Sequence, residues 1–325
     1  MRIYQGAIRS IALVVAYLTC GAAFAQGYPT KPIRLIVPFS PGGASDIVAR
    51  IVAPGLSEFL GQQVVVDNRG GAAGNVGTAI AAQSLADGYT LLLAASSHAI
   101  NQSLHDKLPF HAINSFDPVI LLDSSPFVVA VHPSLPVRSV ADLLKMAKAK
   151  PKELLYPSGG IGSGSHLAGE LFAAMAHVEI RHVPYKGIGP SIVDLIAGRV
   201  HLVFSPPLPI MPYVKMGKVV MIAQTGPGPS AQMPGVPAVA TVVPGYKAIS
   251  WHGILAPAGS PKDIVARLNA GLNAILKQPQ ITQNLSTQGL EPGGGTSTEF
   301  VGYIVADVEK FSKVIKSLDI HARDL

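Results

Sequence analysis

The fold of this 325-residue chain is decided by the stretch Ile33-Arg34-Leu35-Ile36-Val37-Pro38-Phe39, which continues as Ser40-Pro41-Gly42-Gly43-Ala44-Ser45-Asp46. The first seven residues are mostly apolar and predict a buried strand, and the next seven form a Pro-Gly-Gly turn and the acid-tipped start of a helix. The first N–H groups of a helix have no internal partner and carry the positive end of its dipole. The stretch therefore predicts a βα turn that offers N–H groups to a carboxylate or phosphate, with an ordinary βα turn as the competing interpretation.

The N-terminus has the three parts of a secretory signal peptide. Arg2 and Arg9 flank the start of an apolar run over residues 11–18, and Ala23-Phe24-Ala25 supplies the small residues that signal peptidase requires. The run is too short for a membrane-spanning helix, which needs ~20 residues. We expect a signal peptide over residues 1–25, cleavage after Ala25, and export of the mature chain.

Composition predicts an exported protein that is held together by its hydrophobic core. Cys20 is the only cysteine, so the mature chain has no thiol and no disulfide, and it does not follow the residues of a lipoprotein signal. With 48% hydrophobic residues, the mature chain is long enough for two lobes of ~150 residues each. Cleavage removes two arginines and lowers the formal charge from +6 to +4. Charged residues are 14% of the chain and do not cluster with aromatic residues, which argues against nucleic-acid binding.

Short β-branched segments alternate with helical segments that end at Gly or Pro, which is the pattern of βαβ units in a mostly parallel sheet. We predict strands at residues 33–39, 63–67, 90–94, 127–131, 154–156, 180–184, 202–204, 219–223 and 250–256. We predict the clearest helices at residues 46–59, 139–148, 166–176, 191–197, 261–276 and 297–315. Pro54-Gly55 lies inside the first of these and is expected to kink or split it.

Two strand-like segments with many turn residues are expected to cross between two lobes, at residues 121–126 and 245–253. They place residues 26–124 and 251–325 in a discontinuous first lobe and residues 125–250 in a second. A chain that leaves one α/β lobe, builds another and returns leaves a cleft between the carboxyl ends of two sheets, where such sheets bind ligands.

The second lobe contains a loop of similar chemistry. Leu154-Leu155-Tyr156 is followed by Pro157-Ser158-Gly159-Gly160-Ile161-Gly162-Ser163-Gly164-Ser165-His166 and then a helix. Glycine N–H groups and serine hydroxyls before a helix suit an oxyanion, although a flexible surface loop is the alternative. One such loop in each lobe favours the binding interpretation.

A resemblance to a known family rests on several ordered motifs. The segments Tyr28-Pro29-Thr30-Lys31-Pro32-Ile33 and Val37 to Asp46 are similar to the opening signature of the tripartite tricarboxylate transporter substrate-binding proteins, the Bug or TctC family. Further segments that resemble this family lie at residues 60–69, 86–92, 166–172, 183–187 and 251–261. Together they cover essentially the whole mature chain.

The resemblance implies a two-lobe periplasmic binding protein of type II (Venus flytrap), in which each lobe is a mostly parallel sheet flanked by helices. Such a protein captures a small carboxylate-bearing ligand, aliphatic or aromatic, by hinge closure and delivers it to membrane permease subunits of a tripartite tricarboxylate transporter. It implies a monomer without cofactor or metal. A periplasmic sensor that uses the same closed, liganded lobes is the alternative.

Site residues follow from the same resemblance. In the first lobe it points to the Pro-Gly-Gly loop, and the polar residues after the third strand could line the same cleft; together these are Ser40, Pro41, Gly42, Gly43, Ala44, Ser45, Ser96, Ser97, His98 and Asn101. In the second lobe it points to Ser158, Gly162, Ser163, Gly164, Ser165 and Tyr185. Asp46 matches the motif, but its charge repels a carboxylate, so we assign it to helix capping.

One position departs from the family pattern. Many members carry an acid after the strand at residues 202–204, whereas this chain has Ser205-Pro206-Pro207. If Ser205 faces the cleft, the missing negative charge disfavours a ligand with an ammonium group, and hence an amino acid.

An exported hydrolase is the rival class, and the sequence gives it little support. The chain has no Gly-x-Ser-x-Gly, phosphate-loop or His-Glu-x-x-His motif. Ser165 and His166 are neighbours at a helix start, which rarely makes a nucleophile and base pair. His177 and His182 have an odd spacing that turns their rings to opposite faces of an extended chain, which disfavours a metal site. We therefore expect no catalytic residues and no metal.

Overall fold

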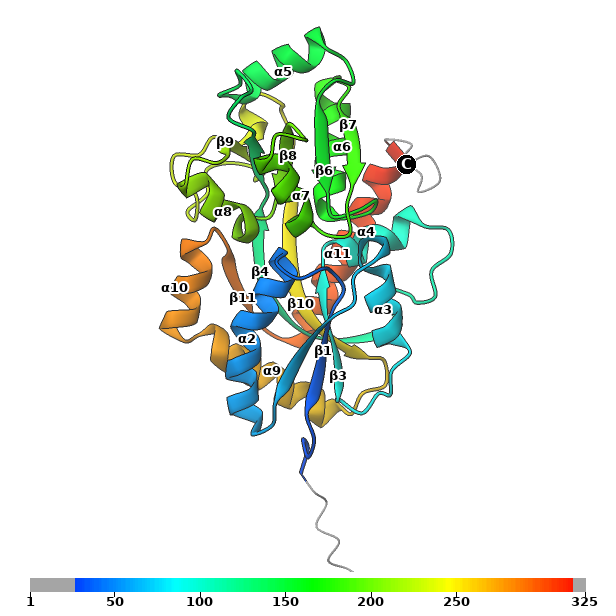
Figure 1. Ribbon diagram of the computed structural model, residues 1–325. Helices are drawn as coiled ribbons and strands as arrows, with labels where there is room; N and C mark the ends of the chain where they lie inside the picture. The colour runs from blue at the N-terminus through cyan, green and yellow to red at the C-terminus, as the bar shows by residue number, and fades with distance from the viewer. Residues whose placement is uncertain (1–26, 318–325) are drawn as a thin grey trace, which may run out of the picture.

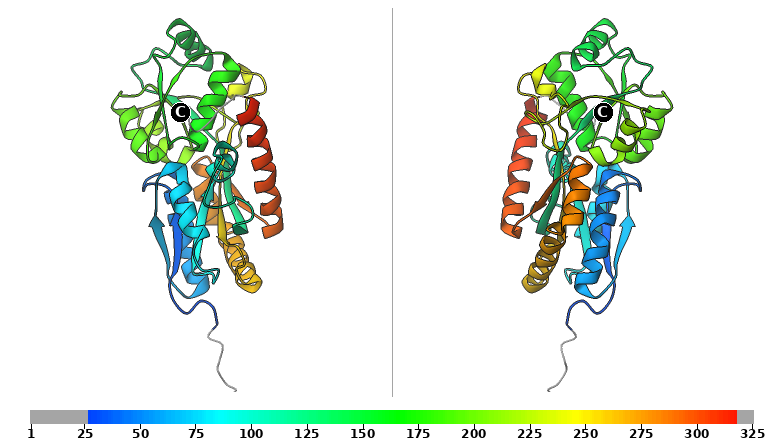
Figure 2. Two further views of the ribbon diagram at one scale, coloured as in Figure 1. Left: turned by 90° about the vertical axis from the view of Figure 1, so that its right-hand side faces the viewer. Right: turned by 90° about the vertical axis from the view of Figure 1, so that its left-hand side faces the viewer.

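The computed structural model describes residues 27–317, so the predicted signal peptide lies outside the described residues. Two α/β bodies are stacked end to end and joined by two long strands (Figure 1). Both side views show the same two-part outline (Figure 2). The predicted two-lobe α/β fold is confirmed.

The first lobe is built on a six-stranded sheet with strand order β11-β4-β10-β3-β1-β2. Its strands are β1 (Ile33–Val37), β2 (Val64–Asn68), β3 (Thr90–Ala95), β4 (Phe116–Pro126), β10 (Ile249–Pro257) and β11 (Glu291–Gly294). Its helices are α2 (Ala44–Leu60), η1 (Ala72–Gly74), α3 (Asn75–Ala82), α4 (Ser97–Leu104), α9 (Lys262–Leu276), α10 (Pro279–Thr287) and α11 (Ser297–Ser317). The sheet thus combines strands from both ends of the chain.

The second lobe consists of the elements between β4 and β10. Its strands are β5 (Val128–Val131), β6 (Leu155–Ser158), β7 (Arg181–Pro184), β8 (Leu202–Ser205) and β9 (Val220–Gln224). Its helices are α5 (Val140–Ala149), α6 (Gly164–Ala176), α7 (Ile188–Ile196), α8 (Pro207–Lys215) and η2 (Val239–Thr241). The strands form the sheets β8-β5-β9 and β6-β7, and β6 lies beside β8, where His201 N donates to Leu155 O at 2.9 Å.

The strand directions correct the expectation of mostly parallel sheets. In the first lobe β1 pairs in parallel with β2 and β3, but β10 is antiparallel to β3 and β4, and β11 is antiparallel to β4. In the second lobe β5 is antiparallel to both β8 and β9, and only β6 and β7 pair in parallel. The reason is topological: β4 leaves the first lobe and β10 returns to it, so the two neighbouring strands run in opposite directions. Apolar strand composition does not report this direction.

The first-lobe sheet is buried on both faces because β1 alternates between two cores. Ile33, Leu35 and Val37 pack with α2 and α9, whereas Ile36 packs on the other side with Trp251 and residues of α11. Fully burying such side chains contributes about 1.5–3 kcal/mol each. This packing fixes where β1 ends, and therefore where the Pro-Gly-Gly loop begins.

Helix α2 continues without a break through Pro54, so the expected split is wrong. The apolar face of this helix, with Val48, Val52 and Leu56, is buried against the sheet on both sides of the proline. That packing outweighs the one backbone hydrogen bond that the proline cannot make. Strand β11 was missed because Glu291-Pro292-Gly293-Gly294 has no strand signal, and pairing with β4 creates the strand.

Strands β4 and β10 connect the lobes and pair along their length, from Phe116 opposite Pro257 to Pro126 opposite Ile249. The predicted lobe boundaries at 124/125 and 250/251 fall inside these two strands. We keep these boundaries as a proposal for the hinge.

Candidate functional site

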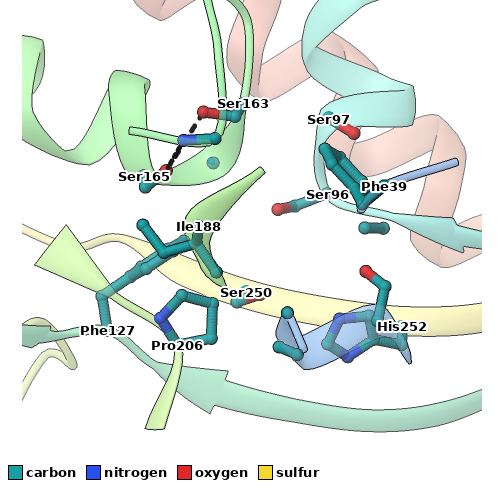
Figure 3. Close-up of a pocket in the computed structure, with 16 residues that line it drawn as sticks. Phe39, Ser96, Ser97, Phe127, Ser163, Ser165, Ile188, Pro206, Ser250 and His252 are labelled. Carbon is teal, nitrogen blue, oxygen red and sulfur yellow. Dashed lines mark hydrogen bonds between the residues drawn. The ribbon is translucent and has the colours of Figure 1, made fainter. Parts of the chain in front are cut away.

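A pocket that encloses about 50 Å³ lies between the lobes (Figure 3). A buried water needs ~10–15 Å³, so the pocket has room for about four water-sized groups, enough for a carboxylate and a few more atoms. Its lining comes from both lobes and the connecting strands: Phe39, Gly43, Ala44, Ser45, Ala95, Ser96, Ser97, Phe127, Gly159, Ser163, Gly164, Ser165, Ile188, Pro206, Ser250 and His252.

Three helices begin at the pocket wall. Helix α2 begins at Ala44, α4 at Ser97 and α6 at Gly164, and each of these residues lines the pocket. The first N–H groups of each helix have no partner within the helix and carry partial positive charge. The pocket therefore presents donors and a favourable field for an anion without any Lys or Arg in its lining.

Four serine hydroxyls add to these donors. Ser45, Ser96, Ser97 and Ser250 are each at least nine-tenths buried as residues, and no hydrogen bond within residues 27–317 engages their hydroxyls. Their oxygens are not fully enclosed by protein, so they are open to the pocket. They can therefore hydrogen-bond to water or to a ligand in the pocket.

In the first lobe, Asp46 fixes the Pro-Gly-Gly loop from outside the pocket. Gly42 N donates to Asp46 Oδ2 at 3.0 Å, and Arg50 Nε donates to Asp46 Oδ1 at 3.0 Å. Burial acts to raise the pKa of Asp46, but the bonds from Arg50 and Gly42 prevail and hold it below its ordinary value. Asp46 lies in the first turn of α2 and does not line the pocket, so its observed role is to tie the loop to the start of the helix through Gly42 N.

In the second lobe, the serines that line the pocket also hold their loop. Ser163 caps α6 by accepting from His166 N at 3.3 Å. Ser165 Oγ accepts from Gly159 N at 3.0 Å (Figure 3). The two hydroxyls lie 3.1 Å apart. Their remaining hydrogen-bonding capacity faces the pocket.

Two histidines support this loop from behind. Gly162 N donates to Nδ1 of His166 at 3.3 Å, and Nε2 of His182 bonds to Ser158 Oγ at 2.6 Å. Burial, and secondarily His182, lowers the pKa of His166 to about 3, and burial lowers that of His182 to about 4. Both rings are therefore neutral at ordinary pH and serve as scaffold.

Half of the predicted site residues line the pocket: Gly43, Ala44, Ser45, Ser96, Ser163, Gly164 and Ser165. The others lie outside its lining: Ser40, Pro41, Gly42, Ser158, Gly162, Tyr185 and Ser205. Of the further candidates after β3, Ser97 lines the pocket, His98 bonds to Ala112 O in the core, and Asn101 Nδ2 donates to Ala73 O.

The residues outside the lining have partners elsewhere. Tyr185 donates to Asp194 Oδ2 at 2.6 Å and faces a separate surface cavity with Ala73 and Lys186. Burial and this bond raise the pKa of Tyr185 to about 12. Ser205 is buried, and its hydroxyl donates to the carbonyl of Pro206 at 2.8 Å. The structure thus turns Tyr185 and Ser205 away from the pocket.

The lobes also contact each other beside the pocket. Ser40 Oγ donates to the Lys186 carbonyl at 2.7 Å, which links the first-lobe loop to the second lobe. A Cβ added to Gly162 would lie 2.0 Å from Asn101 Oδ1 of the other lobe. These contacts define a closed arrangement of the lobes.

Sequence reasoning missed several lining residues, of which His252 matters most chemically. It follows Trp251 on β10, in a segment that the sequence predicted as a strand, a crossing between lobes and a family-like motif, but not as part of the site. Phe39, Phe127, Ile188 and Pro206 supply apolar walls that no motif indicated. Their position depends on how the two lobes meet, so no sequence signal could have found them.

No nucleophile is activated in the pocket. Within residues 27–317, no hydroxyl bonds to Nε2 of His252, and Ser165 and His166 do not bond to each other through their side chains. In the same residues no three His, Cys, Asp or Glu side chains gather closely enough to hold a metal ion. None of the helices in this part of the chain is long and apolar enough to span a membrane.

Two lobes joined by paired strands, with an anion-adapted pocket between them, define the class as a periplasmic binding protein. Residues 48–320 match the family described as the tripartite tricarboxylate transporter family receptor, TctC. The chain therefore belongs to the TctC family, whose members are solute-binding receptors and not enzymes.

Relatives agree with this assignment over nearly their whole length. The protein BugT of Bordetella pertussis is 35% identical, over 90% of this chain and 90% of that protein. A solved R. palustris protein with adipate is 38% identical with a TM-score of 0.88, over 90% of this chain and 99% of that one. MatC from Rhodopseudomonas palustris with bound malate is 26% identical with a TM-score of 0.85, over 89% and 100%.

Proposed function

We propose that this protein is a periplasmic receptor that captures a small carboxylate-bearing organic acid by hinge closure and delivers it to the membrane subunits of a tripartite tricarboxylate-type transporter. The observation that carries the proposal is the set of four serine hydroxyls that open into the pocket without a partner among the described residues, grouped where α2, α4 and α6 begin. Helix N-termini supply donors only, and their dipoles favour negative charge.

A carboxylate suits the pocket better than a cation or an amino acid. No Asp or Glu lines it, so an ammonium group has no charged partner there. The four hydroxyls and the helix N–H groups together provide enough donors for both carboxylate oxygens. The solved relatives with adipate and malate support this ligand class.

Hinge closure is supported by contacts that only closed lobes make. The bond from Ser40 to Lys186 and the approach of Gly164 to Ser96 both join the two lobes. A ligand that bridges the lobes shifts the equilibrium toward the arrangement in which these contacts form.

The test is a thermal-shift and calorimetry screen of the mature chain against succinate, malate, adipate, citrate, benzoate, glutamate and phosphate. Ligand at about 100 times its Kd stabilises the native state by about 2.7 kcal/mol. We expect a carboxylic acid to give the largest shift. Binding of phosphate alone, or of none of these compounds, contradicts the proposal, whereas binding of glutamate alone contradicts the preference for a ligand without an ammonium group.

A matched pair of cap variants separates ligand binding from stability. Ser163 and Ser139 both cap a helix by accepting the N–H three residues on, but only Ser163 lines the pocket. Each Ser→Ala change is expected to cost about 1 kcal/mol of stability. Ser163→Ala should also weaken carboxylate binding about tenfold, whereas Ser139→Ala should leave the Kd unchanged.

Delivery to a transporter needs a separate experiment in cells. Deleting the gene for this chain should abolish high-affinity uptake of the acid found in the screen, and Ser163→Ala should restore uptake only at higher concentration. Unchanged uptake with loss of a transcriptional response to the acid would support a sensor instead.

A further inference from the structure

His252 is the one ionisable side chain in the pocket lining of the described residues. It lies on β10 directly opposite Asp123 of β4, and both residues are almost fully buried. Its Nδ1 lies 3.0 Å from Asp123 Oδ1 and 3.2 Å from Oδ2. The carboxylate thus holds the ring in one orientation, with the far side of the ring available to the pocket.

The proton positions follow from this pairing. An ionised carboxylate only accepts hydrogen bonds, so Asp123 assigns a proton to Nδ1 of His252. In the neutral ring Nε2 then carries a lone pair, and no hydrogen bond within residues 27–317 engages that atom. A lone pair directed at the pocket repels a carboxylate oxygen, unless a second proton lies between them.

We propose that His252 is a specificity-determining ligand contact that binds the carboxylate through a protonated Nε2, so that capture of each ligand takes up one proton. This inference rests on the proposed function. The neutral imidazole gains a proton from the buffer and donates Nε2–H to the ligand oxygen, while Asp123 compensates the ring charge as a positioning residue. An acid that enters with its own proton gives the same net uptake, because that proton also comes from the solution.

Further carboxylates lie on the α11 side of the pair. Burial is the main cause that raises the pKa of Tyr303 on α11 to about 12, and Asp307, Asp123 and Glu291 also raise it. These three carboxylates therefore act on the region around Tyr303. Asp307 accepts a hydrogen bond from Trp251 Nε1 at 2.8 Å and forms an ion pair with Lys310. The charge of Lys310 is therefore paired with Asp307.

The remaining elements that face His252 contribute no opposing charge. On β3, its neighbour is Ala95. The lining residues from α2, α4, α6 and α7, and Pro206 before α8, include no ionisable side chain. The negative charge of a bound carboxylate therefore adds to that of Asp123, and it favours the charged ring in the complex over the charged ring in the free protein.

Calorimetry in buffers of different ionisation enthalpy counts the protons. We would use the carboxylic acid from the screen that shifts the wild-type protein most, titrated at pH 7.5. The expected uptake is above zero and at most one proton per site, because the ring gains its second proton only together with the negative charge of the ligand. The Kd should rise with pH, by at most about tenfold per pH unit.

Variants assign the proton to its residue. His252→Gln keeps a neutral donor and should bind about tenfold more weakly at pH 7, with uptake near zero and a flat pH profile. Asp123→Asn should keep the ring position but reduce the uptake. His98→Gln is the control, since His98 is equally buried in the same lobe but bonds to Ala112 O outside the pocket; its proton uptake should match wild type.

The outcomes separate this inference from the proposed function. Carboxylate binding without proton uptake in the wild-type protein, or equal uptake in His252→Gln, overturns the role of His252 and leaves the receptor function intact. If no carboxylate binds at any pH between 5.5 and 8.5, the role of His252 and the proposed receptor function are both contradicted. The proton count is measured on the wild-type protein, so this test does not depend on whether any variant folds.

Discussion

The two loops that face the pocket have similar sequences but are held in different ways. In the first lobe Asp46 holds the loop from outside by accepting Gly42 N, and the lining hydroxyl of Ser45 stays free. In the second lobe Ser163 and Ser165 line the pocket and also hold the loop through their hydroxyls.

In the first lobe, the residue that holds the loop does not line the pocket. In the second lobe, the same two serines hold the loop and line the pocket. A change at Asp46 should alter the loop shape without removing a side chain from the pocket lining. A change at Ser163 removes a helix cap and a pocket-lining hydroxyl together. The two lobes therefore predict different combinations of stability loss and affinity loss.

The largest expected effect comes from a methyl group at the lobe interface. Gly164→Ala places a Cβ 2.6 Å from Ser96 Oγ of the first lobe and 2.8 Å from the Phe127 ring. Overpacking of this kind costs about 1–3 kcal/mol, and here it opposes closure, so we expect carboxylate affinity to fall about 10- to 100-fold. Isothermal calorimetry measures the change.

The matched control is Gly43→Ala in the first-lobe loop. Its added Cβ would meet Ser40 O at 3.6 Å and Ile188 Cγ2 at 3.7 Å, which is ordinary contact, and its φ of −83° suits alanine. We expect a change in affinity below about threefold. Equal losses for both variants would show that the lobes do not close on the ligand through Gly164.

The second effect tests the external support of the first loop. Asp46→Asn should lower stability at pH 7 by about 1 kcal/mol, because the pair with the exposed Arg50 is screened by solvent and the bond from Gly42 weakens. Since the folded-state pKa of Asp46 is lowered, its contribution is present above its unfolded-state value near 3.8 and is lost as pH falls through the folded value. Chemical denaturation from pH 7 to 2.5 should show the two proteins converge.

Asp142 gives the corresponding control in the second lobe. It also accepts a backbone N–H at the start of a helix, from Arg138, but lies on α5 away from the pocket. Asp142→Asn should leave the Kd unchanged, whereas Asp46→Asn should raise it about three- to fivefold. An unchanged Kd for Asp46→Asn would mean that the loop keeps its shape without this support.

A smaller effect is expected at the direct link between the lobes. Ser40→Ala removes the bond to the Lys186 carbonyl, which forms only when the lobes are closed, and should weaken binding about two- to fivefold with faster release. Stopped-flow fluorescence resolves the release rate. Ser84→Ala removes a similar bond to Ile80 O within one lobe and should change neither rate nor affinity.

The smallest effect concerns Tyr185, which the family pattern placed in the site. Its hydroxyl is bonded to Asp194 outside the pocket, so Tyr185→Phe should change the Kd less than twofold. A tenfold loss of affinity in the calorimetric titration would contradict this prediction. It would indicate that Tyr185 turns toward the pocket and contacts the ligand when the ligand binds.

The parts of the site that the sequence predicted are those encoded locally. Gly43, Ala44 and Ser45 follow a strand with clear β signal, and Ser163 and Gly164 precede a clear helix, so their N–H groups lie at helix starts. The direction in which a side chain points could not be predicted from neighbouring residues. Tyr185 follows a strand as predicted, yet Asp194 draws its hydroxyl away from the pocket.

The sequence by itself determined the α/β alternation, two glycine-rich loops between a strand and a helix, and membership of the TctC family, because strand, turn and helix-start signals depend on neighbouring residues. Tertiary structure alone decided the antiparallel course of β4 and β10, and through it the pairing of Asp123 with His252 at the pocket wall. These two residues are far apart in the chain. Only the return of β10 beside β4 joins them, and no local pattern encodes that return.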